Sequence, residues 1–238
     1  MCERLAQRRG LDVIVSLAGR TAAPLQMPVR VRTGGFGGAS GLAAFLVDER
    51  IDLLIDATHP YAAVISASAA EAATRAHVRI LALRRPPWLR QEGDRWTEVA
   101  DLPEAVRALG HAPRQVFLAL GRKDLAPFES APQHRYLIRS VDPVTPPLRL
   151  PQAGYVTARG PFREADEHVL LQRNGIDVIV AKNSGGDSTY GKIAAARALG
   201  LEVIMPRRPP LPAVPSVARV EEVLAWLDHA GLPSARGV

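Results

Sequence analysis

The stretch Ile51-Asp52-Leu53-Leu54-Ile55-Asp56 decides the fold, because a similar stretch, Ile176-Asp177-Val178-Ile179-Val180-Ala181, occurs in the second half of the chain. Each opens a segment in which a buried strand, a polar loop, an Ala-rich helix and a second strand follow in order. Each segment then ends in Arg-Arg-Pro-Pro, at residues 84–87 and 207–210. Alternating strands and helices predict parallel sheets with right-handed crossovers. We therefore predict an α/β protein of two similar domains, with the active site in the cleft between them.

The composition is that of an ordinary globular protein, with 47% hydrophobic and 23% charged residues in a chain of 238. Cys2 is the only cysteine, so no internal disulfide can form, which favours the reducing cytoplasm. Acidic residues between positions 48 and 56 interrupt the best apolar run before it reaches transmembrane length, and the N-terminus lacks the apolar stretch of a signal peptide. We expect a cytoplasmic protein without a membrane partner.

The net charge of +6 raises the alternative of a nucleic-acid-binding protein. The basic residues are scattered, however, and aromatic residues make up only 5% of the chain, which leaves few surfaces on which bases could stack. A small polyanionic ligand accounts for the charge equally well. We therefore predict no nucleic-acid partner.

Hydrophobic periodicity places the elements of the first half. Strands are expected at 11–17, 29–32, 51–57 and 78–83, and helices at 40–49 and 62–76. Residues 84–100 contain prolines, charges and two tryptophans without a clear period. We place the domain boundary there, which gives an N-terminal domain of residues 1–97 and a C-terminal domain of residues 98–238.

The second half follows the same alternation. Asp101 and Pro103 are typical of the N-cap and first turn of a helix over 102–109. Further helices are expected at 163–173, 189–199 and 217–229, and strands at 115–120, 136–141, 155–158, 176–181 and 202–205.

A dinucleotide-binding domain should open with a strand and a glycine-rich turn. This chain instead opens with a helical fragment at residues 2–9. Either the fold starts differently, or about fifteen residues that would form that strand and turn precede the sequence given.

Two loops of the first domain are candidates for cofactor binding. The first contains Gly19, Arg20 and Thr21, and an arginine at this position accommodates the 2′-phosphate of NADP, although it is equally typical of a surface turn. The second is Gly34-Gly35-Phe36-Gly37-Gly38, whose backbone N–H groups could approach an anion. It matches neither the Rossmann nor the P-loop spacing, so a flexible connection is the alternative.

Thr58 and His59 follow the strand at 51–57, and the carboxyl ends of parallel strands are where ligands bind. His59 could protonate or orient a substrate near neutral pH. A histidine before a proline is also compatible with a capping or packing role.

The loop from Lys182 to Lys192 offers two ammonium groups, hydroxyls and a glycine pair before a helix, where the helix dipole favours anions. Tyr190 and Lys192 are two residues apart and so do not share a helical face, which argues against the tyrosine–lysine pair of short-chain dehydrogenases. The residues of this loop that we select as candidate ligand contacts are Lys182, Asn183, Ser184, Gly185, Gly186 and Lys192.

Arg122 and Arg159 each follow a predicted strand and carry a guanidinium group suited to carboxylates. The six histidines and one cysteine show no metal-ligand spacing, and no Gly-x-Ser-x-Gly nucleophile motif is present. We therefore predict no metal site.

These motifs together resemble the precorrin-6A reductase family of cobalamin biosynthesis, which includes cobalt-precorrin-6A reductases. The motifs that carry the resemblance run in family order over almost the whole chain: SLAGRT (16–21), GGFGG (34–38), DATHPYA (56–62), RPPW (85–88), GR (121–122), ARGPF (158–162), KNSGGDSTYGK (182–192) and RRPPLP (207–212).

The resemblance implies two Rossmann-like domains and an NAD(P)H-dependent reduction of a macrocycle double bond, with NADPH the expected cofactor and NADH possible. The substrate it implies is a tetrapyrrole rimmed by carboxylates, which would account for the cationic strand ends. His59 and Tyr190 are then the candidate proton donors, and Thr58 a candidate substrate contact. The protein is expected to be a monomer or homodimer. The alternative from another class is a non-catalytic, two-lobed binding protein for an anionic small molecule or tetrapyrrole.

Overall fold

The computed structural model describes residues 1–19 and 26–230, so Arg20 and Thr21 lie outside the described residues. The chain forms two compact units. Unit 1 consists of residues 1–85 together with 209–238, and unit 2 consists of residues 86–208.

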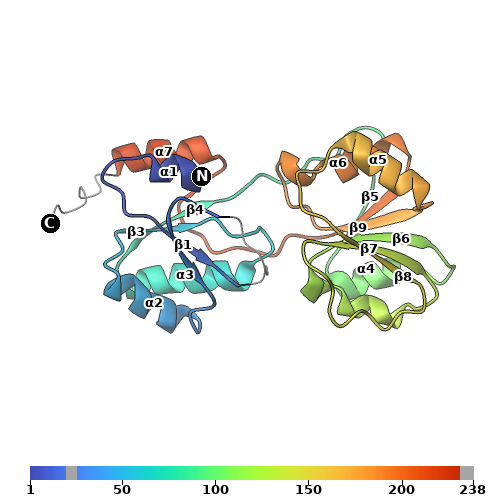
Figure 1. Cartoon of the computed structure of the whole chain (residues 1–238), viewed down its shortest axis with the longest axis horizontal. Helices are drawn as coiled ribbons and strands as arrows, with labels where there is room; N and C mark the ends of the chain where they lie inside the picture. Colours follow the sequence, from blue (N-terminus) through green and yellow to red (C-terminus); the bar gives the residue numbers. More distant parts are fainter. Residues whose placement is uncertain (20–25, 231–238) are drawn as a thin grey trace. The chain divides into compact units, whose positions relative to one another are not determined.

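Unit 1 contains two parallel sheets. β1 (Ile14–Leu17) pairs with β2 (Arg30–Thr33), and β4 (Arg79–Leu83) lies between β3 (Leu53–Asp56) and β11 (Ser216–Val217). Helices α1 (Cys2–Ala6) and α7 (Val220–His229) cover one side, and α2 (Ala39–Asp48) and α3 (Ala63–Arg75) cover the other (Figure 1). Leucines of α2 pack against small alanines of α3, which lets the two helices approach closely; the buried members are Leu42, Leu46, Ala69 and Ala72.

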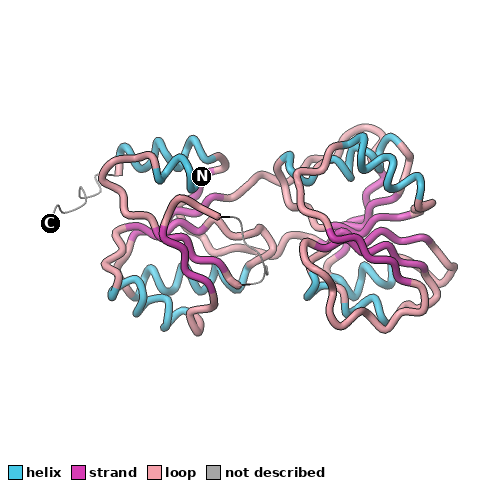
Figure 2. The backbone as a smooth tube through the Cα atoms, in the orientation of Figure 1, coloured by secondary structure: helices cyan, strands magenta, loops and turns pink. Residues whose placement is uncertain are grey.

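Unit 2 contains one parallel sheet in the order β5-β10-β9-β6-β7-β8. The strands are β5 (Arg95–Val99), β6 (Gln115–Ala119), β7 (Arg135–Ser140), β8 (Ala153–Thr157), β9 (Val178–Ala181) and β10 (Glu202–Pro206). Helices α5 (Glu164–Arg173) and α6 (Gly191–Ala198) lie on one face, and α4 (Leu102–Ala108) lies on the other (Figure 2). Three short 3-10 turns are η1 (Arg122–Asp124), η2 (Ala126–Ser130) and η3 (Asp187–Thr189).

The strand order of unit 2 is that of a doubly wound, Rossmann-like fold. From β6 the chain proceeds outward to β7 and β8, and then returns to β9 on the other side of β6 and proceeds to β10. The winding therefore reverses between β6 and β9. Ligands of such sheets bind outside the carboxyl ends of the strands at this reversal, so the loops after β6 and β9 are where a site is expected.

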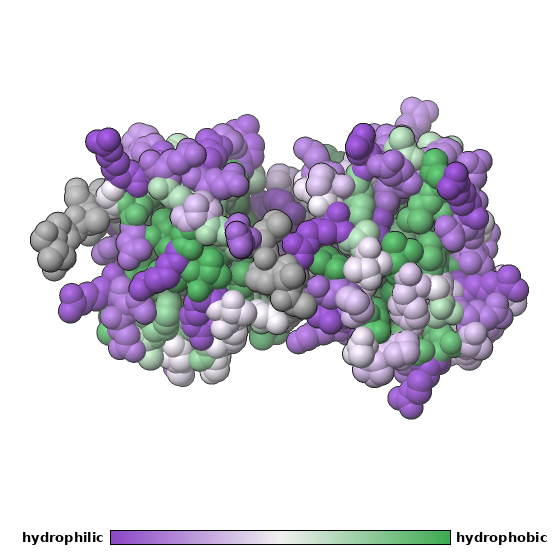
Figure 3. Space-filling model, in the orientation of Figure 1, coloured by the Kyte–Doolittle hydropathy of each residue, from purple (hydrophilic) through white to green (hydrophobic). Residues whose placement is uncertain are grey.

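The repeated apolar stretches form the predicted strands. Every residue of β9 is fully buried, which is typical of a central strand covered by helices on both faces. β3 is less enclosed, because only Asp56 of its four residues is buried. In the view of Figure 3, hydrophilic residues dominate the surface over the helices, and much of the hydrophobic surface lies between the helical layers. No helix within residues 1–19 and 26–230 is long and apolar enough to cross a membrane.

Unit 2 begins at Pro86, within the stretch 84–100 where the boundary was expected, and the boundary drawn at residue 97 therefore lies too far along the chain. It falls within β5, which pairs with β10 at the edge of the unit 2 sheet. The chain then leaves unit 2 after Arg208, and β11 pairs with β4 in unit 1. Both strands were absent from the predicted elements, because their places depend on partners far away in the sequence. The predicted cap is confirmed, since the Asp101 side chain accepts a 2.8 Å hydrogen bond from the Glu104 amide.

Candidate functional site

Charged side chains occupy the carboxyl ends of β6 and β9, where the winding of unit 2 reverses. Lys182 follows the last residue of β9, and its Nζ donates to Oδ2 of Asp124 at 2.7 Å. Asp124 belongs to η1, which follows β6. The side chains of Lys182 and Asp124 are 19% and 26% exposed, so the pair is accessible but not freely solvated. Lys182 therefore lies at the carboxyl edge of the sheet, and its contact with a ligand stays a prediction.

A second ion pair lies one strand further along the same edge. Arg122, after β6, lies 3.6 Å from the carboxylate of Asp142, which follows β7. Arg122 also donates to the Pro143 carbonyl at 3.4 Å. Two cations at this edge are thus each held by a carboxylate from a neighbouring loop. The sequence analysis missed Asp124 and Asp142, since their partners are remote in sequence; the only available signal was that both follow predicted strands.

Arg159 follows β8 at the next strand end and is exposed. The turn after it is attached to the Lys182–Lys192 loop, because the Phe162 amide donates to the Ser188 carbonyl at 3.0 Å. Arg122, Arg159 and Lys182 therefore share one edge of a single sheet, as predicted. A set of cations along one edge is suited to a ligand with several carboxylates.

Asn183 and Gly186 fasten the loop to Trp88. The Trp88 amide donates to Asn183 Oδ1 at 2.8 Å, and Asn183 Nδ2 donates back to the Trp88 carbonyl at 3.0 Å. The Trp88 indole N–H donates to the Gly186 carbonyl at 2.8 Å. Arg208, at the end of unit 2, donates from Nε to the Asn183 carbonyl at 2.8 Å. Asn183, predicted as a ligand contact, thus joins the chain segments that enter and leave unit 2, through its side-chain amide to Trp88 and its backbone carbonyl to Arg208.

Gly185 is needed for packing. Its φ is +65°, and a Cβ atom would lie 2.1 Å from the Pro86 carbonyl oxygen. Both the conformation and the close backbone contact exclude a side chain. Ser184 Oγ donates to the Lys182 carbonyl at 3.4 Å, a long bond within the loop. Gly185 therefore shapes the loop, and Lys182 supplies a positive charge at the carboxyl edge of the sheet.

The structure contradicts direct substrate contact by Lys192. The residue is 4% exposed, and its Nζ donates to the Thr189 carbonyl at 2.5 Å beneath the loop. Burial, with a smaller effect from Arg139, lowers the pKa of the amine to about 7, while Glu167 acts in the opposite direction. Lys192 lies in the first turn of α6, and this position directs its side chain into the interior. The sequence pattern of the loop does not reveal that direction.

Tyr190 is also placed differently from the prediction. Its ring packs edge-on against Trp88, with 5.6 Å between the centroids, and its hydroxyl accepts a 2.5 Å hydrogen bond from Arg197. The same guanidinium binds Asp94, which directly precedes the amino end of β5. The hydroxyl therefore points away from the carboxyl ends of the strands, and the geometry contradicts a role as proton donor there.

The glycine-rich loop of unit 1 has an open surface. Cβ atoms added to Gly34, Gly35, Gly37 or Gly38 would meet nothing within 4 Å. Gly38 is the N-cap of α2, a helix of ten residues, so backbone N–H groups at a helix N-terminus face this open space. Such groups can bind anions. The loop therefore has the geometry of a possible anion site, and its contact with a cofactor stays a prediction.

Side chains and the neighbouring strand hold this loop in shape. Arg32 donates to the carbonyls of Gly34 and Gly35, at 2.7 and 2.8 Å, and stacks 3.8 Å above the Phe36 ring. Phe36 itself packs on Phe45 of α2, with 5.1 Å between the centroids. Phe36 is thus an anchor of the loop, and Arg32 is a contributor that the sequence analysis missed.

The other predicted cofactor loop lies beside the glycine-rich loop. The Gly34 amide donates to the Leu17 carbonyl at 2.8 Å, at the paired ends of β1 and β2. A Cβ on Gly19, where φ is +68°, would lie 3.3 Å from Thr33 Cγ2. The structure therefore brings Gly19 and the glycine-rich loop together, as predicted.

Thr58 and His59 follow β3. The Thr58 hydroxyl donates to Asp56 Oδ1 at 2.7 Å and also contacts Ser66 Oγ at 3.1 Å, so it shapes the turn around a buried carboxylate. His59 is exposed, and its Nδ1 accepts a 3.3 Å hydrogen bond from the Tyr61 amide. In the neutral imidazole the proton then resides on Nε2, which is the atom that can donate.

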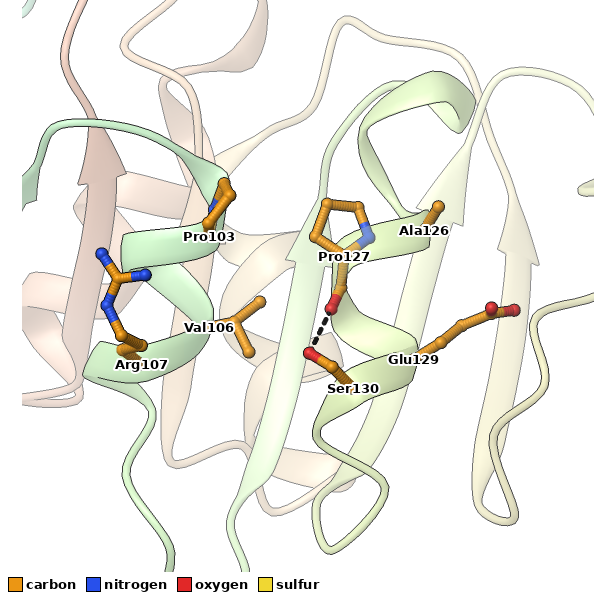
Figure 4. Close-up of a pocket in the computed structure, with 7 residues that line it drawn as sticks. All are labelled: Pro103, Val106, Arg107, Ala126, Pro127, Glu129 and Ser130. Carbon is orange, nitrogen blue, oxygen red and sulfur yellow. Dashed lines mark hydrogen bonds between the residues drawn. The ribbon is translucent and has the colours of Figure 1, made fainter.

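A groove on unit 2 lies apart from these residues. It has a volume of about 620 Å³ and runs between α4 and η2, where the Ser130 hydroxyl donates to the Pro127 carbonyl (Figure 4). None of the predicted site residues lines it. In the part of the chain that the structure describes, no group of three His, Cys, Asp or Glu residues could hold a metal ion.

Comparison with known proteins identifies the family. The family described as precorrin-6x reductase CbiJ/CobK matches residues 1–228. The chain belongs to this family.

Its relatives cover nearly the whole sequence. A precorrin-6A reductase of Sinorhizobium sp is 58% identical over 229 residues, which are 96% of this chain and 88% of that protein. One from Rhodobacter capsulatus is 48% identical over 97% of this chain and 91% of its own. A cobalt-precorrin-6A reductase of Priestia megaterium is more distant, at 27% identity over 92% of this chain and 89% of its own. A solved structure of CobK precorrin-6A reductase has a TM-score of 0.92 and 47% identity, covering 99% of this chain and 95% of the other.

Proposed function

We propose that this protein reduces precorrin-6A to precorrin-6B, with NADPH as the hydride donor. The observation that carries the proposal is the row of cations at the carboxyl edge of unit 2, in a chain that belongs to the precorrin-6x reductase family. Arg122, Arg159 and Lys182 follow three strands of one sheet, at and beside the point where the winding reverses. A tetrapyrrole rimmed by acetates and propionates has the charge that such a row would bind.

The substrate carboxylates would engage these cations in exchange for part of their present pairing. Asp124 and Asp142 hold Lys182 and Arg122 in place before the ligand binds. Preorganised cations lose less conformational entropy on binding than freely rotating side chains. The aspartates also leave the edge with a modest net charge, so binding would depend on several simultaneous carboxylate contacts.

The glycine-rich loop of unit 1 is the proposed cofactor site. Gly34, Gly35, Gly37 and Gly38 leave open space before the N-terminus of α2, where the diphosphate would bind. Arg20 is proposed to bind the 2′-phosphate, with Gly19 and Thr21 completing the turn. When bound, NADPH supplies a hydride to one carbon of the conjugated macrocycle, and the neighbouring carbon takes up a proton.

His59 is the proposed proton donor. Since Tyr190 is engaged by Arg197, His59 is the candidate whose imidazole lies at a strand end. As a general acid His59 would be the imidazolium, which carries a proton on both nitrogens. The hydrogen bond from the Tyr61 amide to Nδ1 would then be lost on protonation, and Nε2 would transfer its proton. Water is the alternative donor, and the two are distinguished by the activity of His59→Gln.

The metal-free substrate is favoured over the cobalt form. The two relatives above that exceed 40% identity are named precorrin-6A reductases, whereas the Priestia megaterium relative, named for the cobalt substrate, is only 27% identical. We therefore expect faster turnover of precorrin-6A than of cobalt-precorrin-6A.

The cofactor assignment is tested with Arg20→Ala. Loss of the guanidinium should raise the dissociation constant for NADPH far more than that for NADH, because only NADPH carries the 2′-phosphate. Fluorescence titration of the reduced cofactors measures both constants. Equal weakening of the two cofactors would contradict the assignment.

A further inference from the structure

A buried lysine supports the loop that presents Lys182. Lys192 lies in the first turn of α6, directly beneath η3. Its Nζ donates to the Thr189 carbonyl and lies 4.9 Å from the centroid of the Trp88 ring. The residue is only 4% exposed. Neither substrate nor cofactor could reach this amine while the loop is in place.

Trp88 links Lys192 to the rest of the loop. Its backbone is bonded to the Asn183 side chain, and its indole N–H is bonded to the Gly186 carbonyl. Lys192 therefore contacts the loop directly at Thr189, and through Trp88 at Asn183 and Gly186. All three residues belong to the loop that follows Lys182, whose ammonium would face the proposed substrate.

The charge of Lys192 is poorly compensated. Among the described residues, the charged groups that act on it are Arg139 of β7 and Glu167 of α5. These two form a buried, bidentate ion pair with each other, with side chains 6% and 3% exposed. Tyr190, on the same helix as Lys192, is held by Arg197. Glu167 is thus largely neutralised by Arg139, and the Lys192 ammonium is left with a carbonyl and an aromatic ring.

We propose that Lys192 is a positioning residue: its buried amine holds the loop from Lys182 to Thr189 closed over Trp88, and the loop opens when that amine must carry a proton. The inference deepens the proposed function and rests on it, because the loop matters to catalysis only if Lys182 binds the substrate. Its physical part, the coupling of protonation to loop opening, holds for the protein without any ligand.

Linkage fixes the direction of the effect. In the closed loop the pKa of Lys192 is about 7, and exposure to water on opening would return it towards the ordinary value of 10.5. The open loop therefore binds more protons between these values, so protons favour opening. Relative to the open loop, the closed loop becomes more stable as the pH rises from 7 towards 10.5. Below pH 7 its relative stability is lower and no longer changes with pH.

Hydrogen exchange of the ligand-free protein tests this coupling. Amides of residues 183–190 should become better protected from pH 7 to pH 9, after correction for intrinsic exchange rates, while amides of β6 serve as the internal reference. In Lys192→Met the protection of the loop should be independent of pH. Lys123→Met, which removes an exposed lysine, is the matched control and should keep the wild-type dependence.

The outcomes separate the coupling from the proposed function. Flat protection in the wild type would overturn the inference even if Lys192→Met does not fold, because the wild-type titration needs no variant. A pH dependence retained in Lys192→Met would overturn it as well.

Steady-state kinetics then test whether protonation of Lys192 changes substrate binding. In the wild type the KM for precorrin-6A should fall severalfold from pH 7 to pH 9, and in Lys192→Met this fall should be absent. A KM with the same pH dependence in both proteins would overturn the positioning role. If the wild type does not consume NADPH with precorrin-6A, the proposed function fails, and the exchange data still decide whether protonation opens the loop.

Discussion

The glycine-rich candidate loops of the two units differ in how their glycines pack. In unit 1, Cβ atoms at Gly34, Gly35, Gly37 and Gly38 would project into open space. In unit 2, a Cβ on Gly185 would lie 2.1 Å from a backbone oxygen, and one on Gly191 would lie 2.5 Å from another. Glycine-rich loops that look alike in sequence therefore have different structural roles. One leaves its backbone exposed, and the other allows segments of chain to pack closely.

The two units also differ in the groups that they offer to an anionic ligand. Unit 1 offers backbone N–H groups at the N-terminus of α2, where Arg75 of α3 donates to Ser40 Oγ at 2.8 Å. Unit 2 offers side-chain cations, with Lys182 and Arg122 each fixed by an aspartate. A backbone cradle is suited to a compact diphosphate, and spaced cations are suited to carboxylates distributed around a large ring.

The largest expected effect follows from the packed glycines. Gly185→Ala should destabilise the protein by about 3 kcal/mol or more, because it combines a positive φ with a backbone clash that no rotamer relieves. Urea denaturation followed by circular dichroism measures the loss. Gly35→Ala is the matched control in the open loop, and its stability should stay within about 0.5 kcal/mol of the wild type. Equal destabilisation of both variants would remove the distinction between the two loops.

The second effect concerns the pH dependence of stability. Between pH 7 and pH 9 the unfolded chain binds more protons than the folded one at Lys192, whose pKa is lowered to about 7. The free energy of unfolding should therefore rise by about 2 kcal/mol over this range. Lys192→Met should lack this increment. A variant whose stability follows the wild-type curve would show that the amine is not buried with a lowered pKa.

The third effect tests the cationic edge of unit 2. Lys182→Met should raise the KM for precorrin-6A about tenfold, since it removes one charge-assisted contact among several. The dissociation constant for NADPH should change less than twofold, because the cofactor is assigned to unit 1. Steady-state kinetics and fluorescence titration measure the two quantities. A larger loss of NADPH affinity than of substrate affinity would contradict this assignment and would indicate that unit 2 binds the cofactor.

The smallest effect tests the open loop of unit 1. Gly35→Ala should raise the dissociation constant for NADPH about fivefold, because the added methyl group occupies space that the cofactor would approach. The KM for precorrin-6A should stay close to that of the wild type. Unchanged NADPH affinity would show that the open space before α2 is not the cofactor site.

Local sequence patterns were sufficient to predict most of the elements. Apolar runs such as Val178–Ala181 and the helix signals at Asp101 and Pro103 depend on neighbouring residues alone, and the structure confirms them. β5 and β11 were missed for a different reason. Arg95–Val99 is a polar edge strand, and Ser216–Val217 is too short to show a period. Only pairing with β10 and β4 defines them, and that pairing also returns the end of the chain to unit 1.

The candidate site was predicted in part. Residues at strand ends, such as Lys182 and Arg122, could be selected because the carboxyl ends of parallel strands meet at one edge. Lys192 and Tyr190 were assigned to the ligand from the same motif, although the start of α6 directs both into the packing between elements. Asp124 depends on a contact between distant loops, which single-sequence periodicity does not contain.

The central claim is that this protein reduces precorrin-6A at the expense of NADPH. The most direct test is an anaerobic assay in which the absorbance of NADPH is followed after precorrin-6A is added to the purified protein. One equivalent of NADPH should be consumed per equivalent of tetrapyrrole, and Lys182→Met should be slower at precorrin-6A concentrations below its raised KM. Binding of precorrin-6A by folded protein without any oxidation of NADPH would contradict it and would indicate a non-catalytic binding protein.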